Sequence, residues 1–313
     1  MKVDFKKWSA LIPVIMLPLG IYLGYRAFRG HSLADVLASV AAIPHLNLAA
    51  AFGCAAASYL CLSGFDTLAI RYAGRSLPYR KILLTSFVSL SIGHNVGVAA
   101  LSSGTLRYRF YSGFGLTGVE VGKIIVFCGI TVGLGLMTLG GIALLLHPQS
   151  LQEMLGVASP LARAAGVLCL ALSAAYVLLS WKLRRPLTIR GHRLYLPSPL
   201  IALAQIGIGT LNFGFVAATL HQLLAAASTY LKMVAAYVMG NVAGLISHVP
   251  GGLGVLEYVI STLIGEGDVI GALIAFRIVY FVIPLLIGSL LLLASEVHRH
   301  RNGADDRRAA QRT

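Results

Sequence analysis

The strongest constraint on this chain is a series of apolar runs, each long enough to cross a membrane. A helix rises about 1.5 Å per residue, so about 20 apolar residues cross the roughly 30 Å of hydrocarbon. Six runs meet this length, at 9–27, 47–70, 122–147, 161–181, 198–221 and 271–295. With 57% apolar and only 12% charged residues, the composition excludes both a soluble domain and a disordered chain. We therefore predict an all-α polytopic membrane protein with about six transmembrane helices.

Two further apolar stretches, 82–118 and 232–265, are interrupted by polar residues and glycines near their middles. Such interruptions occur at membrane depth only where protein or a water-filled cavity satisfies the freed backbone groups. We therefore expect two re-entrant or broken helical hairpins in addition to the six spans.

The basic residues lie mainly in short segments between the apolar runs. The 25 Lys and Arg residues outnumber the 11 Asp and Glu residues, which in a soluble chain would suggest binding to nucleic acid. Here they follow the positive-inside pattern, because 71–81, 182–193 and the charged tail 297–313 are basic whereas 148–160 contains Glu153 and no Lys or Arg. We predict cytoplasmic N- and C-termini and no nucleic-acid partner.

A weak internal repeat divides this single membrane domain, residues 1–313, into two units. Shifting the first spans by 150 positions places each of them close to a later span, which suggests repeats at 1–150 and 151–300. A unit that crosses three times would leave the second unit inverted. Inverted repeats of this kind build secondary transporters, whose binding sites lie where broken helices meet near the midplane.

The sequence contains no recognisable catalytic or metal-binding motif. There is no Ser/His/Asp arrangement, no HExxH and no phosphate-binding P-loop. The four cysteines all lie in apolar runs and form no CxxC, so neither a disulfide framework nor a zinc site is indicated. We expect no cofactor, no metal and no enzymatic activity.

Charged residues inside the apolar runs are the first candidates for a functional site, because each one is costly in hydrocarbon. Arg277 interrupts the last span too deeply for easy snorkelling. Two compatible interpretations stay open for it: a structural salt bridge to Glu257 or Asp66, and a contact with a lipid phosphate or a gating role. For Asp66, an ion pair with nearby Arg71 is favoured over a role in proton transfer.

The second hairpin carries a glycine-rich turn, in which Gly251, Gly252 and Gly254 precede Glu257. Glycine tolerates positive φ, and a half-helix that begins there would point its free N–H groups and positive dipole end into the protein. This arrangement predicts an anion site, with a plain tight turn as the alternative.

The first hairpin offers guanidinium groups flanked by hydroxyls and aromatic rings. Ser102 and Ser103 precede Arg107, Tyr108 and Arg109. A guanidinium binds phosphate oxygens in a bidentate fork, and aromatic rings favour the headgroup level of the membrane. The residues suit a phosphodiester, although Arg109 fits an interfacial anchor equally well.

Several other polar or small residues inside the apolar runs favour structural roles. His94 and Asn95 are expected to cap broken backbone more than to contact substrate, and Gln205, Thr210 and Asn212 to form hydrogen bonds between helices. A GxxxG pattern at Gly129 and Gly133 is weak evidence for close helix packing.

Three ordered motifs resemble those of a known family. They are the segment 101–111, the segment 250–257, and Arg277 followed by Tyr280, Pro284 and Gly288. In these motifs the chain resembles the lysylphosphatidylglycerol synthase transmembrane family. This is the flippase-like membrane half of the bacterial multiple peptide resistance factor, which also occurs as stand-alone proteins of the YbhN type.

The resemblance implies a bacterial inner-membrane protein that translocates an anionic or aminoacylated phospholipid, such as phosphatidylglycerol or its lysyl form. It assigns the site to Arg107, Arg109, Glu257 and Arg277, and it leaves room for a homodimer or a separate lipid synthase as partner. The chain stops at Thr313 without a synthase domain, so we expect no lysyl transfer. Two alternatives stay open: a non-transporting partner of a lipid synthase, and an integral lipid-modifying enzyme.

Overall fold

The computed structural model describes most of the chain. The described residues are 33–95, 99–183, 187–189, 192–194, 196–224, 228–247, 254–264 and 269–310. The predicted first span, 9–27, lies outside them, as do Gly251 and Gly252 of the predicted anion site.

Five helical segments are long and apolar enough to cross a membrane, and they coincide with the other five predicted spans. They are α3 (His45–Tyr72), α6 (Gly118–Leu146), α8 (Ser159–Lys182), α9 (Pro199–Leu223), and a last segment over Gly271–Val297. The last segment is built from α12 (Val269–Arg277), the π-helix η2 (Ile278–Val282) and the first part of α13 (Ile283–Ala310). The all-α polytopic class is confirmed.

The start of α6 shows how the sequence sets a span boundary. The Thr117 hydroxyl accepts a hydrogen bond from the Glu120 N–H at 3.4 Å, and Glu120 Oε2 accepts one from the Thr117 N–H at 2.7 Å. This reciprocal capping box satisfies backbone donors that would otherwise be unpaired. It fixes the helix start immediately before the apolar run.

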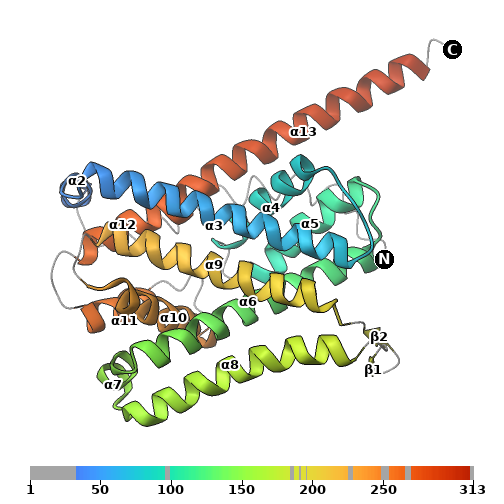
Figure 1. Ribbon diagram of the computed structural model, residues 1–313. Helices are drawn as coiled ribbons and strands as arrows, with labels where there is room; N and C mark the ends of the chain where they lie inside the picture. The colour runs from blue at the N-terminus through green and yellow to red at the C-terminus, as the bar shows by residue number, and fades with distance from the viewer. Residues whose placement is uncertain are drawn as a thin grey trace.

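The spanning helices form a bundle with α3 and α9 side by side at its centre (Figure 1). Helix α6 packs against α9 and against α8, which lies at the edge of the bundle and is the least buried of the five spans. One end of the bundle, here called the α7 end, carries α2 (Leu33–Ala41) and α7 (Gln149–Leu155). The opposite end, the β end, carries the two short strands.

Both interrupted stretches form pairs of short helices. The first pair is α4 (Tyr79–Gly93) and α5 (Ala99–Gly113), and the second is α10 (Tyr230–Ser247) and α11 (Val255–Ile264). The partners in each pair pack against each other. The sequence therefore located both breaks correctly.

The structure also contains features that the sequence analysis did not anticipate. Strands β1 (Leu187–Ile189) and β2 (His192–Leu194) pair antiparallel at the predicted 182–193 loop, and β2 extends one residue beyond it. Helix α13 continues to Ala310, through most of the segment expected only as a charged tail, and extends well beyond the bundle (Figure 1).

Close helix packing uses different glycines from those that the GxxxG pattern indicated. A Cβ at Gly135 would lie 2.5 Å from the carbonyl carbon of Gly209, so α6 and α9 touch backbone to backbone. At Gly129 and Gly133 a Cβ would meet nothing within 4 Å. Glycine at the Gly135–Gly209 crossing is required because any side chain there would separate the helices.

The element order is compatible with the predicted repeat. Helix α4 begins at Tyr79 and α10 at Tyr230, while α6 begins at Gly118 and α12 at Val269, so both pairs are offset by about 150 residues. The division into two inverted units stays a prediction.

Candidate functional site

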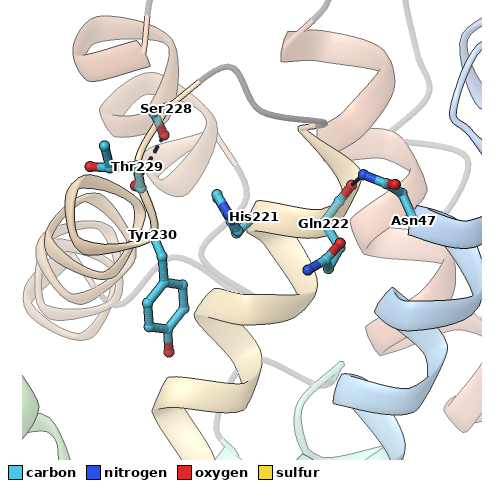
Figure 2. A pocket seen from close by; sticks show the side chains of 6 residues that line it. All are labelled: Asn47, His221, Gln222, Ser228, Thr229 and Tyr230. Carbon is cyan, nitrogen blue, oxygen red and sulfur yellow. Dashed lines mark hydrogen bonds between the residues drawn. The ribbon is translucent and has the colours of Figure 1, made fainter.

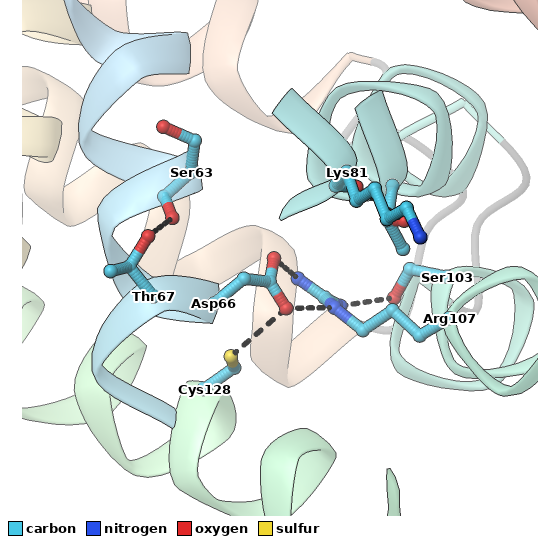
Figure 3. A network of polar contacts seen from close by, with 8 residues as sticks. Ser63, Asp66, Thr67, Lys81, Ser103, Arg107 and Cys128 are labelled. Atoms are coloured by element: carbon cyan, nitrogen blue, oxygen red, sulfur yellow. Dashed lines mark hydrogen bonds and ion pairs between the residues drawn. The ribbon is translucent and has the colours of Figure 1, made fainter. Parts of the chain in front are cut away.

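Among the described residues, the most deeply buried ion pair joins Asp66 of α3 to Arg107 of α5 (Figure 3). Arg107 Nε donates to Asp66 Oδ1 at 2.8 Å, and Nη2 donates to Oδ2 at 2.9 Å. The Asp66 side chain is fully buried and that of Arg107 is 4% exposed. The expected partner of Asp66 was Arg71, and the structure replaces it with a residue from the first hairpin.

The hairpin places Arg107 opposite α3 through a tight contact between α4 and α5. A Cβ at Gly93 would lie 2.8 Å from Ser103 Cβ, so only glycine allows this approach. One turn further along α5, Arg107 Nη1 donates to Ser103 Oγ at 3.3 Å. Cys128 of α6 completes the surroundings, with its Sγ 3.9 Å from Asp66 Oδ1.

The other candidates of the first hairpin point elsewhere. Arg109 forms an ion pair with Glu296 of α13 rather than joining Arg107. Tyr108 is 42% exposed and its ring lies against Gly118 at the start of α6. Ser102 belongs to α5, but its side chain is not among those described. The two guanidiniums therefore serve different helix contacts instead of forming one cluster.

The second ion pair joins Glu257 of α11 to Arg277 of α12. Both Nη2 and Nε of Arg277 bind Glu257 Oε1, at 2.8 and 2.9 Å. Glu257 Oε2 accepts a hydrogen bond from the Gly254 N–H at 2.8 Å. Gly254 has a positive φ of +82°, a conformation that glycine tolerates. Thus the anion at the start of α11 is the Glu257 carboxylate itself. Of the two carboxylates considered for Arg277, the structure pairs it with Glu257 and not with Asp66.

The π-helix η2 follows Arg277 directly, and Pro284 explains where it lies. Pro284 lacks an N–H, so it cannot donate to the carbonyl of Tyr280 as an α-helical residue would. The Tyr59 hydroxyl donates to that carbonyl instead, at 3.2 Å. Asn95, at the tip of the first hairpin, donates to the carbonyl of Phe281 at 3.4 Å and also caps α4 at Ser91 O. The last span is thus irregular where side chains from α3 and the hairpin contact its backbone.

Polar side chains meet near the middle of the central helices. Ser58 Oγ donates to Asn212 Oδ1 at 2.8 Å and lies 2.8 Å from the Tyr280 hydroxyl, so the contact links α3, α9 and η2. The His94 ring stacks on Tyr280 with centroids 6.5 Å apart. Gln205 donates to Thr131 Oγ1 at 2.9 Å. The expected interhelical role is confirmed for Asn212 and Gln205.

A separate pocket of about 590 Å³ lies among α3, α9 and the start of α10 (Figure 2). Asn47 closes one side through a hydrogen bond from its Nδ2 to Gln222 O at 3.1 Å. On the other side, the His221 ring lies edge-on to Tyr230 with centroids 5.8 Å apart. The remaining lining residues are Ser228 and Thr229. Each of the described lining residues carries a polar group, and none of them is a carboxylate or a guanidinium.

Comparison with known proteins decides the family. The chain is 34% identical over 262 residues to the inner membrane protein YbhN of Escherichia coli K12, which covers 81% of this chain and 82% of YbhN. It is 35% identical over 273 residues to the uncharacterized protein slr0712 of Synechocystis, which covers 85% of each chain. The chain belongs to the YbhN family. No family model matches it.

Membership in the YbhN family agrees with the fold. A relative that is an inner membrane protein, together with five helices able to span a bilayer, makes this chain a multi-pass inner membrane protein. Within the described residues, no three His, Cys, Asp or Glu side chains gather in a way that could hold a metal ion.

Sequence reasoning missed the Asp66–Arg107 pair and the role of Tyr59. One signal for the Tyr59 contact was present, because a proline inside a span frees a carbonyl that some donor must satisfy. The Asp66 partner left no such signal, since both Arg71 and Arg107 were available in the sequence.

Proposed function

We propose that this YbhN-family protein is a transporter, without enzymatic activity, that moves an anionic phospholipid headgroup between the leaflets of the inner membrane. The observation that carries the proposal is the Arg277–Glu257 pair at the start of the half-helix α11. Two features of it favour a transported anion: its position at a helix break, and the unequal exposure of its members.

Glu257 is the accessible member of the pair. Its side chain is 31% exposed, whereas that of Arg277 is 7% exposed. A phosphodiester that approaches the pair can accept the two Arg277 hydrogen bonds now made to Glu257, because guanidinium binds both groups in the same geometry. The N-terminus of α11 adds a favourable dipole for the phosphate.

Replacement of Glu257 by the phosphodiester on Arg277 lowers the free-energy barrier to transfer of the headgroup between the leaflets. A phosphate that enters hydrocarbon alone loses its hydration without compensation, whereas a fixed guanidinium replaces part of the lost water contacts. The released Glu257 carboxylate can then contact an amino group, which suits an aminoacylated headgroup. The motif resemblance to the lysylphosphatidylglycerol synthase transmembrane family supports phosphatidylglycerol or its lysyl form as cargo.

Liposomes that contain the purified protein test this proposal. We expect faster exchange of phosphatidylglycerol between leaflets than in empty liposomes, and a rate at least tenfold lower for Arg277→Gln, since a lost charge-assisted hydrogen bond is worth about 1.5–3 kcal/mol. The matched control is Arg163→Gln on the exposed surface of α8, which should keep the wild-type rate.

The lipids should include phosphatidylglycerol, its lysyl form and cardiolipin, each with and without a proton gradient. Folded wild-type protein that accelerates none of them would refute the proposal and favour a non-transporting partner of a lipid synthase. Chemical conversion of a lipid in the same assay would favour the enzyme alternative.

A further inference from the structure

Two buried hydroxyl groups on α4 have no hydrogen-bond partner among the described residues. They belong to Ser86 and Ser89, whose side chains are 0% exposed. Other hydroxyls of the same helix are satisfied locally: Thr85 Oγ1 donates to Lys81 O at 2.8 Å and Ser91 Oγ to Val88 O at 3.3 Å. Because an unpaired buried hydroxyl is costly, Ser86 and Ser89 require an explanation.

The register of the hairpin relates the positions of these two serines to that of Arg107. Helices α4 and α5 follow each other as a hairpin, and Gly93 touches Ser103. One turn away from that contact along each helix, Ser89 comes level with Arg107. Ser86 follows on the same face of α4. By the same register Ser86 lies level with Phe110, so the two serines lie along the segment of α5 from Arg107 to Phe110.

Arg107 has an edge that Asp66 does not use. Its Nε and Nη2 bind the two oxygens of Asp66 at 2.8 and 2.9 Å (Figure 3). Its Nη1 faces Ser103, through a longer hydrogen bond of 3.3 Å. The Nη1 group of Arg107 can therefore donate a hydrogen bond to a second anion while the ion pair with Asp66 stays in place.

We propose that Ser86 and Ser89, together with the Nη1 edge of Arg107, bind a phosphate group, in particular the phosphodiester of a lipid headgroup. A phosphodiester offers several acceptor oxygens, which match two O–H donors and one N–H donor in number and type. The hydroxyls stay unpaired in the resting protein because the ligand is their partner. The lipid as cargo rests on the proposed function, whereas the phosphate site does not.

Thermal unfolding of the purified protein in neutral detergent tests the site without any transport measurement. The variants are Ser86→Ala, Ser89→Ala and the double variant, with Ser91→Ala as the matched control because its hydroxyl already has a partner. Without ligand, the double variant should unfold at a higher temperature than the wild type, since two unpaired hydroxyls are removed. Phosphatidylglycerol should raise the unfolding temperature of the wild type and of Ser91→Ala. This stabilisation should be largely lost in the double variant.

Three additives identify the source of the phosphate: phosphatidylglycerol, inorganic phosphate, and diacylglycerol, which lacks the phosphate. Stabilisation by either phosphate compound that the double variant loses supports the site, and a stronger effect of phosphatidylglycerol identifies a lipid. Equal stabilisation of the wild type and the double variant overturns it. So does a lower unfolding temperature of the ligand-free double variant, because the hydroxyls would then hold structural water.

In the liposome assay, the double variant should exchange phosphatidylglycerol about tenfold more slowly than the wild type, as expected for lost hydrogen bonds to a charged group. An active wild type with an equally active double variant contradicts the serine site alone. An inactive wild type contradicts the proposed transport, while the unfolding experiment still decides on the site.

Discussion

The Asp66–Arg107 pair shows how much depends on single residues in this protein. Both side chains are almost completely buried, so removal of one leaves a charge without a partner in a low-dielectric interior. We expect Asp66→Ala or Arg107→Ala to lower the free energy of unfolding by about 3–5 kcal/mol. The double variant Asp66→Leu, Arg107→Leu should recover much of this loss. Thermal unfolding and the yield of monodisperse protein measure it.

The exposed pair of Arg75 and Glu120 is the control for this experiment. Its side chains are 44% and 20% exposed. Solvent screens such a pair, so Arg75→Ala should change the unfolding free energy by less than about 1 kcal/mol. If Asp66→Ala and Arg107→Ala also changed the free energy of unfolding by less than about 1 kcal/mol, the buried pair would not stabilise the fold.

Among the helices, the irregular last span offers the clearest prediction. Pro284→Ala restores an N–H that can donate to the Tyr280 carbonyl, and this N–H competes with the Tyr59 hydroxyl that now occupies the carbonyl. Tyr59→Phe alone should cost about 0.5–1.5 kcal/mol, because it removes the hydrogen bond that the Tyr59 hydroxyl donates to this carbonyl. In the Pro284→Ala background the same substitution should cost clearly less.

A double-mutant cycle on thermal stability measures this coupling. The matched control is Tyr176→Phe, which removes a hydroxyl that donates to Gln205 Oε1 at 2.7 Å, far along the sequence from Pro284. Its effect should be the same in both backgrounds. Additive effects of Tyr59→Phe and Pro284→Ala would show that Pro284 does not determine which group donates to the Tyr280 carbonyl.

For the whole molecule, the testable property is its orientation in the membrane. The β end carries the basic 71–81 segment and α7 lies at the opposite end, so the positive-inside rule predicts a cytoplasmic β end. In a variant without the four natural cysteines, Ala158→Cys should react with a membrane-impermeant maleimide in intact cells. Ser76→Cys should react only after the membrane is opened. Labelling of Ser76→Cys in intact cells would reverse the topology.

The sequence by itself determined the membrane class, five described spans and both helix breaks. Hydrophobic length and interrupting polar residues are local properties that survive in any packing arrangement. It also narrowed the ion-pair partner of Arg277 to Glu257 or Asp66, because a charge inside an apolar segment needs an opposite charge beside it.

Only the tertiary structure decided which partners meet. Asp66 binds Arg107 instead of Arg71, and Gly135 with Gly209 forms the close crossing instead of Gly129 and Gly133. The π-helix and the contacts to its carbonyls likewise depend on side chains from distant segments. The physical reason is that a helix apolar on all sides carries no record of which face meets a neighbour, so its rotation is set by packing alone.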